Sequence, residues 1–249
     1  MPTPDDLGTP VDVPTTATRV VSLVPSLTEA VAATRPEALV GATEWCTHPA
    51  DLDVARVRGT KNVDWRAVVA LSPDLVIANQ EENREIDVRR LREAGVPVWV
   101  TVIESVPQSL DAMDRLFAEA LGWGIPEWLA EARRLWDTAL PPITTRVAVP
   151  IWRDPWMVVG SRTYTGDLLR RVGFDNVFEQ HSGRYPKVDL ADLDRADIDL
   201  VLLPDEPYVF TPEDGPESFT HTATQLVSGR HLTWYGPAMV EAHQALTRL

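Results

Sequence analysis

The chain has little cysteine, no long apolar run and no excess of positive charge. Cys46 is the single cysteine among 249 residues, so no disulfide can form within the chain. There are 23 Lys and Arg residues against 37 Asp and Glu, and the net charge is −14. Because phosphates are bound by Lys and Arg, we expect no nucleic-acid partner. No run approaches the ~18 apolar residues of a membrane span, so we expect no membrane-spanning segment.

The start of the chain, 1–18, lacks the features of a secretion signal. It has no basic start, no apolar core and no cysteine for lipid attachment, and it is rich in Pro, Thr and Asp. We therefore predict a flexible leader over 1–18 and a cytoplasmic protein. If the start were that of a processed form, the same chain would act outside the cytoplasm.

The common catalytic signatures are also missing. No GxSxG elbow, P-loop, HExxH or Rossmann glycine fingerprint occurs in the sequence. A Cys46 thiolate activated by His48 is an alternative, but two residues so close on one loop rarely reach the required geometry. The sequence therefore indicates a binding protein and not an enzyme.

An internal repeat is the strongest positive signal in the sequence. Arg19 and Arg146 each open a strand-like run. Val63 and Val188 each begin a run that ends in an Asp followed by an apolar strand, and nearly the same spacing separates the members of both pairs. A near-constant offset predicts two similar α/β halves. Between them, Pro126–Leu140 has helical spacing of its apolar residues and is expected to join the halves.

The predicted organisation is therefore an α/β protein with two similar three-layer lobes, a single long bridging helix and a ligand cleft between the lobes. The expected parts are a leader over 1–18, an N-terminal lobe over 19–121, the bridge over 122–142 and a C-terminal lobe over 143–249. The strands are expected over 20–24, 39–42, 75–78, 96–102, 146–151 and 200–203. The helices are expected over 29–34, 65–71, 86–94, 107–121, 126–140 and 166–172.

Aromatic residues follow several of the predicted strands. Trp45, Trp152, Trp156 and Tyr185 stand in loops without helical periodicity. Their flat faces suit a large planar or macrocyclic ligand, because stacking and apolar burial bind such molecules. The alternative is that these side chains fill the interface between the lobes.

One loop alternates three metal-binding residue types. Glu44, Cys46 and His48 would share a face of an extended segment, where carboxylate, thiolate and imidazole suit zinc or another transition ion. No CxxC or HxxxH pair supports this site. The alternative is a buried cysteine beside a hydrogen-bonded histidine.

Charged residues mark three further loops. Glu81 and Glu82 either bind a cation or ligand amide, or belong to a solvated helix start. Arg153 either pairs with Asp154 or reaches an anionic group of a ligand. Glu206 stands between two prolines after a strand, which predicts a rigid loop with a ligand or docking role.

Several short motifs resemble a known family. They are Val24-Pro25-Ser26-Leu27-Thr28-Glu29, Leu71-Ser72-Pro73-Asp74-Leu75-Val76-Ile77, Gly59-Thr60, Gly95-Val96-Pro97-Val98, Gly166-Asp167-Leu168-Leu169 and Gly173-Phe174-Asp175-Asn176-Val177-Phe178. In this order and spacing they resemble the helical-backbone (class III) substrate-binding proteins of ABC importers, and among these the cobalamin-binding, BtuF-like proteins. The resemblance covers the chain from Arg19 to the end.

The resemblance implies which residues bind the ligand and which dock to a permease. It implies cleft residues at Trp45 and His48, in the Asn79–Asn83 loop, in the Trp152–Trp156 loop and at Tyr185. Acidic residues that dock to ABC permease subunits are implied at Glu85 and, in the second lobe, beside Ala191, where Asp189 and Asp192 are the neighbours. Ala191 itself departs from the family pattern.

Two functions follow from the sequence. The first is a binding protein for a corrinoid, haem-like compound or metal chelate, which implies a small-molecule or metal-chelate ligand and ABC permease subunits as partners. The alternative is a cytosolic protein that handles a metal or small molecule on the same scaffold without an importer, acting as an enzyme in one version. The short bridge favours a narrow cleft.

Overall fold

The structure, a computed structural model, describes residues 2–249 and divides into two compact units. Unit 1 takes the chain up to Ile103, together with Pro107–Arg134 and Tyr235–Pro237. Unit 2 takes Glu104–Val106, Leu135–Trp234 and Ala238–Leu249. Each unit is an α/β structure around its own parallel sheet, as the sequence predicted.

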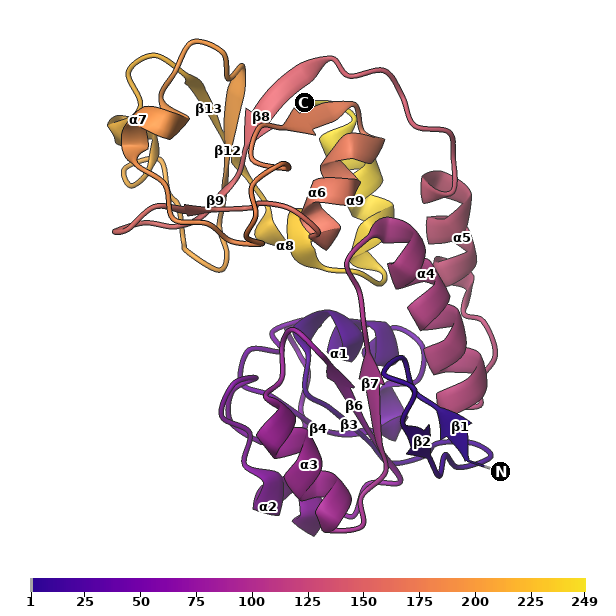
Figure 1. Ribbon diagram of the computed structural model, residues 1–249. Coiled ribbons are helices and arrows are strands. Elements are labelled where there is room, and N and C mark those ends of the chain that lie inside the picture. The colour runs from indigo at the N-terminus through magenta and orange to yellow at the C-terminus, as the bar shows by residue number, and fades with distance from the viewer. Residues whose placement is uncertain (1) are drawn as a thin grey trace. The chain divides into compact units, whose positions relative to one another are not determined.

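Unit 1 contains a parallel sheet in the order β5-β4-β3-β6-β7. Its strands are β3 (Val20–Ser22), β4 (Leu39–Ala42), β5 (Ala55–Arg56), β6 (Leu75–Asn79) and β7 (Val98–Thr101). Its helices next to the sheet are α1 (Pro25–Ala32), η1 (Pro36–Ala38), α2 (Trp65–Ala70) and α3 (Glu85–Glu93). Helix α1 lies on one face of the sheet and α2 and α3 lie on the other, which gives three layers (Figure 1).

Sequence accounts for these elements directly. The central strands are short Val- and Ile-rich runs that are buried on both faces, as expected for a parallel sheet. Helix α2 begins after Asp64, whose carboxylate accepts a hydrogen bond from the backbone N–H of Ala67 at 3.2 Å. Val68, Val88 and Leu91 from α2 and α3 then pack on the sheet in one apolar core.

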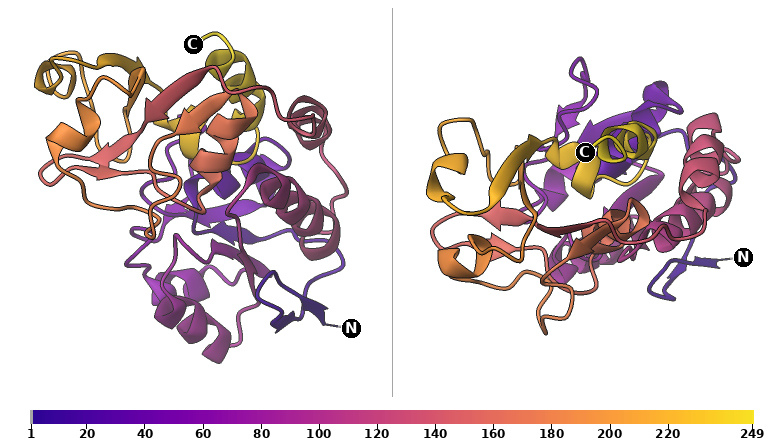
Figure 2. Two further views of the ribbon diagram at one scale, coloured as in Figure 1. Left: turned by 45° about the horizontal axis from the view of Figure 1, so that its top comes forward. Right: turned by 90° about the horizontal axis from the view of Figure 1, so that it is seen from above.

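The helical segment after β7 consists of three parts. They are α4 (Val106–Arg115), the π-helical turn η2 (Leu116–Ala120) and α5 (Glu127–Trp136). Helices α4 and α5 run side by side in both figures, and Arg133 pairs with Asp111 at 3.1 Å and with Asp114 (Figures 1 and 2). The helix predicted over 126–140 ends early, at Trp136, where Asp137 and Thr138 are weak helix formers. The boundary between the units falls inside α5, after Arg134.

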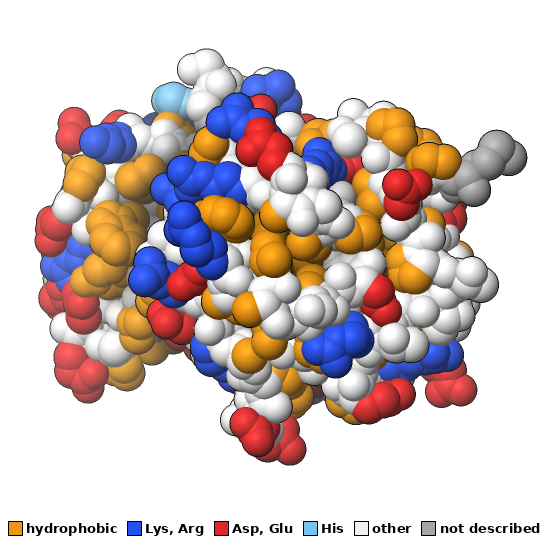
Figure 3. All heavy atoms as spheres, turned by 90° about the horizontal axis from the view of Figure 1, so that it is seen from below, with side chains coloured by type: hydrophobic (Ala, Val, Ile, Leu, Met, Phe, Trp, Pro, Cys, Tyr) orange, Lys and Arg blue, Asp and Glu red, His pale blue; other side chains and the backbone are white. Residues whose placement is uncertain are grey.

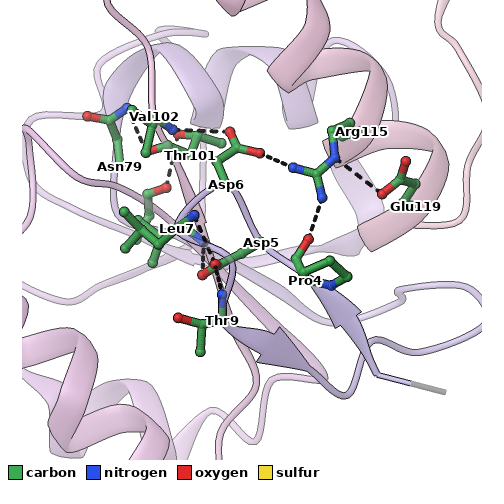
Figure 4. Close-up of polar contacts among 12 residues, drawn as sticks. Pro4, Asp5, Asp6, Leu7, Thr9, Asn79, Thr101, Val102, Arg115 and Glu119 are labelled. Atoms are coloured by element: carbon green, nitrogen blue, oxygen red, sulfur yellow. Dashed lines mark hydrogen bonds and ion pairs between the residues drawn. The ribbon is translucent and has the colours of Figure 1, made fainter.

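The start of the chain differs from the flexible leader that was predicted over 1–18. It forms a short antiparallel pair, β1 (Thr3–Pro4) and β2 (Pro10–Val11). The Asp6 carboxylate accepts a hydrogen bond from the N–H of Val102 at 3.1 Å and pairs with Arg115, as Figure 4 shows. Asp5 pairs with Arg92 at 2.7 Å. Composition predicted a flexible leader because it cannot show that Asp5 and Asp6 form ion pairs with arginines far along the chain.

Unit 2 contains a parallel sheet in the order β11-β8-β12-β13 and a separate hairpin of β9 and β10. The strands are β8 (Thr145–Ala148), β9 (Pro150–Trp152), β10 (Met157–Val158), β11 (Phe174–Asn176), β12 (Leu200–Pro204) and β13 (Ala223–Val227). The helices are α6 (Tyr164–Arg171), α7 (Leu190–Leu193), η3 (Pro216–Ser218), α8 (Gly229–Thr233) and α9 (Ala238–Leu246). The strand predicted over 146–151 is thus two strands, and the second pairs outside the main sheet.

The repeat in the sequence corresponds to a repeat in the structure. The order β4-β3-β6-β7 in unit 1 matches the order β11-β8-β12-β13 in unit 2. In unit 1, the Asp74 carboxylate accepts hydrogen bonds from the N–H groups of Thr18 and Arg19 at the start of the central strand. In unit 2, Asp199 does the same for Arg146 at 2.7 Å. The two similar α/β halves that the repeat predicted are confirmed. No helix of residues 2–249 is long and apolar enough to cross a membrane.

Candidate functional site

The predicted ligand residues are the last residues of strands or lie in the loops after them, and these strands are parallel except for β9, which pairs antiparallel with β10. In unit 1 these loops follow β4 and β6, and in unit 2 they follow β9, β11 and β12. The carboxyl ends of parallel strands are the usual place for ligands in open α/β sheets, because loops converge there. We describe the loops of each unit separately.

The loop after β4 presents an exposed tryptophan. Trp45 is 65% exposed, while the neighbouring Cys46 is fully buried. Arg56 fixes the loop, since its guanidinium donates hydrogen bonds to the carbonyls of Thr43 at 3.0 Å and Cys46 at 2.9 Å. His48 is exposed and contacts Thr47 Oγ1 through Nδ1 at 3.2 Å.

The metal site expected at Glu44, Cys46 and His48 is not formed. The Cys46 thiol points inward, 2.9 Å from Thr28 Oγ1 and 3.1 Å from Thr43 Oγ1, whereas Glu44 and His48 are exposed. Burial raises the pKa of the thiol, against smaller opposing effects of the two threonine hydroxyls. Within residues 2–249, no group of three or more His, Cys, Asp and Glu side chains is placed to hold a metal ion. Strict alternation failed because a turn follows Thr43, so side chains two apart do not share a face.

The loop after β6 is held mainly by its asparagines. Asn79 is buried; its Oδ1 accepts a hydrogen bond from the N–H of Glu81 at 2.9 Å, and its Nδ2 donates to Thr101 Oγ1 at 3.1 Å. Asn83 Nδ2 donates to the carbonyl of Leu23 at 3.1 Å. These amides shape the loop, which leaves Glu81 and Glu82 as its half-buried carboxylates. Burial raises the pKa of Glu82, and the charge of Lys61 opposes that rise.

The two tryptophans of the loop after β9 lie in different environments. Trp152 is 46% exposed, and its ring meets Tyr208 edge to face at 5.6 Å. Trp156 is only 8% exposed and stacks on Phe210 with 5.9 Å between ring centroids. Trp156 therefore belongs to the core of unit 2 and not to a ligand surface, which corrects the prediction. The chain turns between the two tryptophans, at Pro155. Their closeness in the sequence therefore does not give them the same exposure.

Arg153 pairs with Asp154, as one of the two alternatives predicted, but its shorter contacts are with residues that the sequence did not suggest. Its guanidinium lies 2.6 Å from Glu217, also pairs with Asp214, and is 3.1 Å from Ser218 Oγ. Asp154 is more distant, at 3.8 Å. The hydrogen bonds that Arg153 donates to Glu217 and Asp214 raise the pKa of its guanidinium. Sequence reasoning missed Asp214 and Glu217 because both are distant from Arg153 along the chain.

Two further predicted ligand residues differ in exposure. Tyr185 is 37% exposed in the loop after β11. Glu206 is half-buried and packs against Gly229, where a Cβ atom would stand 2.3 Å from Glu206 Cγ. Tyr185 therefore exposes part of its ring, and Glu206 packs against Gly229.

The predicted docking residues are all exposed. Glu85 is the first residue of α3, while Asp189 precedes α7 and Asp192 lies within it. The Asp192 carboxylate accepts a hydrogen bond from the N–H of Asp189 at 3.2 Å. Both therefore contribute to the start of α7, and docking at these residues stays a prediction.

Unit 2 also contains a hollow that the sequence did not indicate. It has a volume of about 300 Å³ at the start of α6, and charged residues of both signs line it, including Arg162, Asp167, Asp175 and Glu179. Among the described residues, none donates a hydrogen bond to the buried Glu179 Oε2. Burial raises the pKa of this carboxyl group. No local motif marks the hollow, because its residues come from separate turns.

Comparisons with known proteins agree on the fold. No family model matches the chain. A vitamin B12-binding protein of Vibrio vulnificus is 26% identical over 181 residues, covering 69% of this chain and 66% of the relative. One of Vibrio campbellii is 24% identical over 183 residues, covering 70% and 66%. The chain thus spans slightly less than two thirds of the length of these curated relatives.

Solved structures cover nearly the whole chain. The periplasmic vitamin B12-binding protein BtuF of Vibrio cholerae superposes with a TM-score of 0.73 at 18% identity, covering 93% of this chain and 96% of that one. The periplasmic haem-binding protein BhuT, in complex with two haems, gives 0.74 at 22% identity, covering 92% and 96%. CeuE of Helicobacter pylori with bound Ni(II) gives 0.79 at 13% identity, covering 99% and 87%. The chain therefore has the fold of the helical-backbone substrate-binding proteins, as its motifs predicted.

Proposed function

We propose that the chain is a substrate-binding protein for a large, flat metal chelate such as a corrinoid or haem. The observation that carries this proposal is the exposure of three aromatic side chains on strand-end loops. Among residues 2–249, the exposed large aromatic side chains are Trp45, Trp152 and Tyr185, at 65%, 46% and 37%. Trp45 and Tyr185 stand in loops after parallel strands, where ligands bind in this class of sheet, and Trp152 is the last residue of β9 in the antiparallel hairpin.

The physical argument is that exposed indole rings are unfavourable in water unless they meet a partner. A flat macrocycle that covers a tryptophan face removes apolar surface from water and gains stacking contacts. Trp152 is supported from the side by Tyr208, so its orientation is fixed before a ligand arrives. Such preorganisation lowers the entropy lost on binding.

The names of the similar proteins support binding of this ligand class. They include binding proteins for vitamin B12 and for haem, and a structure with bound nickel. Binding, and not catalysis, is therefore the role we propose. The alternative of a metal ion held by Glu44, Cys46 and His48 has no support in the geometry of that loop.

A titration tests the proposal directly. Hydroxocobalamin and haem are added separately to the purified protein while tryptophan fluorescence is followed. We expect saturable quenching by one of them. Trp45→Ala in unit 1 and Trp152→Ala in unit 2 are each expected to weaken binding by about tenfold, because each removes a large stacking surface.

Ile125→Ala is the matched control. Ile125 is an apolar side chain of unit 1 that is 51% exposed but lies outside the strand-end loops. We expect unchanged affinity for this variant. A protein that shows no response to either compound at high micromolar concentration would refute the macrocycle proposal.

We further propose that the protein acts outside the cytoplasm and delivers its ligand to an ABC permease. Several similar structures are described as periplasmic proteins. Reconstitution with an ABC permease and its ATPase would test this step. Ligand-stimulated ATP hydrolysis is expected, and Glu85→Arg is expected to reduce it. Unchanged stimulation in that variant would reject Glu85 as a docking residue.

A further inference from the structure

Unit 1 carries a basic hollow beside helices α2 and α3. Its volume is about 640 Å³, and its lining includes four arginines: Arg58, Arg66, Arg84 and Arg90. Asn62, Asp64 and Trp65 also line it. A concentration of arginine stands out in a chain whose net charge is −14. We call these four residues the arginine cluster.

Three segments of the fold bring the arginine cluster together. Arg58 lies in the loop after β5, Arg66 on α2, Arg84 just before α3, and Arg90 on α3. Helices α2 and α3 pack side by side on the same face of the sheet. They lie at the bottom of Figure 1, so the view of Figure 3 faces them and shows Lys and Arg side chains gathered in one area.

Carboxylates offset only part of this charge. Buried Asp87 pairs with Arg84 at 2.8 Å and with Arg90 at 3.4 Å. Asp64 lies 3.8 Å from Arg58. Arg66 lies over the Trp65 ring at 4.5 Å, and among residues 2–249 no carboxylate forms an ion pair with it. Two carboxylates therefore face four guanidinium groups, which leaves a local excess of positive charge.

The contacts with Asp87 also orient the N–H donors of Arg84 and Arg90. A guanidinium has five N–H donors, and Asp87 occupies only part of those of Arg84 and Arg90. Asn62 Oδ1 accepts a hydrogen bond from the N–H of Gly59 at 3.0 Å, which orients its amide. Because Asp87 already holds Arg84 and Arg90, an anion that contacts these two guanidinium groups pays less of the ordering cost.

We propose that the arginine cluster binds a small molecule that carries two or more phosphate groups. Guanidinium groups match phosphate oxygens with paired, charge-assisted hydrogen bonds, and several of them suit a ligand with closely spaced charges. The strongly negative protein would repel an extended nucleic acid, whereas a compact anion meets only the local positive charge. The hollow shares no lining residue with the proposed macrocycle site.

Calorimetric titration with inorganic tripolyphosphate tests this proposal. We expect saturable binding by the wild-type protein, weakening as salt is added. Arg66→Ala and Arg58→Ala are each expected to weaken binding by about tenfold, since each removes a charge-assisted contact. Arg66→Lys retains the charge but not the paired donors and is expected to have intermediate affinity. Circular dichroism checks that each variant is folded. We expect the Arg66 variants to fold, because the side chain of Arg66 is exposed.

Arg89→Ala is the matched control. Arg89 also lies exposed on α3, pairs with Glu93 at 3.7 Å and does not line the hollow. We expect its tripolyphosphate affinity to equal that of the wild type. Equal weakening by Arg89→Ala would show general charge attraction and overturn the site, as would the absence of any binding. Equally tight binding of citrate would overturn the assignment to phosphate. Unchanged haem or cobalamin binding in Arg66→Ala would confirm that the two sites are separate.

Discussion

The two units connect equivalent strands in different ways. In unit 1, helix α3 carries the chain from β6 to β7. In unit 2, the equivalent connection from β12 to β13 runs over 205–222 and contains only the short turn η3. We call this segment the unit 2 crossing. The strand order is the same in both, so the helix is not required for the sheet to form.

The two connections differ in which groups accept hydrogen bonds from their backbone N–H groups. In α3, the helix hydrogen bonds do so, and Val88 and Leu91 anchor the helix in the core. In the unit 2 crossing, backbone hydrogen bonds form mainly in short turns, and side-chain oxygens accept hydrogen bonds from several other N–H groups. The Asp194 carboxylate accepts hydrogen bonds from the N–H groups of Thr220, His221 and Thr222, each at 2.8 Å. A long loop can thus replace a helix when single side chains collect its unpaired donors.

We expect the largest effect when the Asp194 carboxylate is removed. Asp194→Ala leaves three backbone N–H groups of the unit 2 crossing without their acceptor, together with Thr220 Oγ1 and His221 Nδ1. We expect the free energy of unfolding to fall by about 3 kcal/mol or more, and the melting temperature by roughly 6 °C or more. Hydrogen exchange should accelerate over 211–222 and remain unchanged in unit 1.

Glu213→Ala is the control for that variant. Glu213 is an exposed carboxylate in the same crossing, and among the described residues no salt bridge involves it. Its melting temperature should equal that of the wild type. If Asp194→Ala were equally harmless, side-chain capture of the backbone would not be what holds the unit 2 crossing.

The corresponding change in unit 1 should have a smaller effect. Asp87→Asn removes the buried charge that pairs with Arg84 and Arg90 at the start of α3. We expect a loss of about 1–3 kcal/mol in the free energy of unfolding, because the helix keeps its own hydrogen bonds and core contacts. Chemical denaturation measures this loss, with Glu93→Gln at the exposed end of α3 as the control. A larger loss than that of Asp194→Ala would reverse the comparison.

Arg153→Gln should loosen the unit 2 crossing without unfolding it. The variant removes the ion pairs to Asp214 and Glu217, while Tyr208 still donates to Asp214 at 2.7 Å. These pairs are partly exposed, so we expect a change of about 1 kcal/mol or less in global stability. Hydrogen exchange over 211–218 should rise several-fold. Unchanged exchange would show that the aromatic cluster alone holds this part of the crossing.

The smallest effect should appear in acid. Partial burial opposes ionisation of Asp194, but the hydrogen bonds from Thr220, Thr222 and His221 outweigh it and hold its pKa well below the usual range. A carboxyl group of this kind stabilises the fold above its unfolded pKa of about 3.9 and loses that contribution as the pH falls. The stability of Asp194→Asn should therefore depend less on pH below about 5 than that of the wild type. Parallel curves for the two proteins would contradict this pKa shift.

Local patterns predicted much of the fold. The repeat predicted two similar halves because the same hydrogen bond recurs in each. The Asp74 carboxylate accepts it from the N–H of Arg19, and the Asp199 carboxylate accepts it from the N–H of Arg146. Strand β13 was missed because Ala223–Val227 has few strongly apolar residues and is only partly buried. The sequence predicted no helix or strand within the unit 2 crossing. Its order depends on Asp194 and Arg153, which are distant in sequence.

The site was predicted only in part. Loop position correctly marked Trp45, Trp152 and Tyr185 as exposed aromatics, but it could not separate Trp152 from the buried Trp156. Alternation could not show that Cys46 turns inward while Glu44 and His48 stay exposed. The arginine cluster was not predicted, because its members become neighbours only when α2 packs against α3. Exposure and convergence both depend on tertiary packing, which spacing does not specify.

The burial of Cys46 makes its thiol a probe for the transient opening of unit 1. Its sulfur is buried between Thr28 and Thr43, and its raised pKa keeps it as a thiol at neutral pH. A thiol-selective reagent can therefore label the native chain only when this part of unit 1 transiently opens. Because the sequence has no other cysteine, the rate of a single alkylation reports the opening of one unit without a signal from the other.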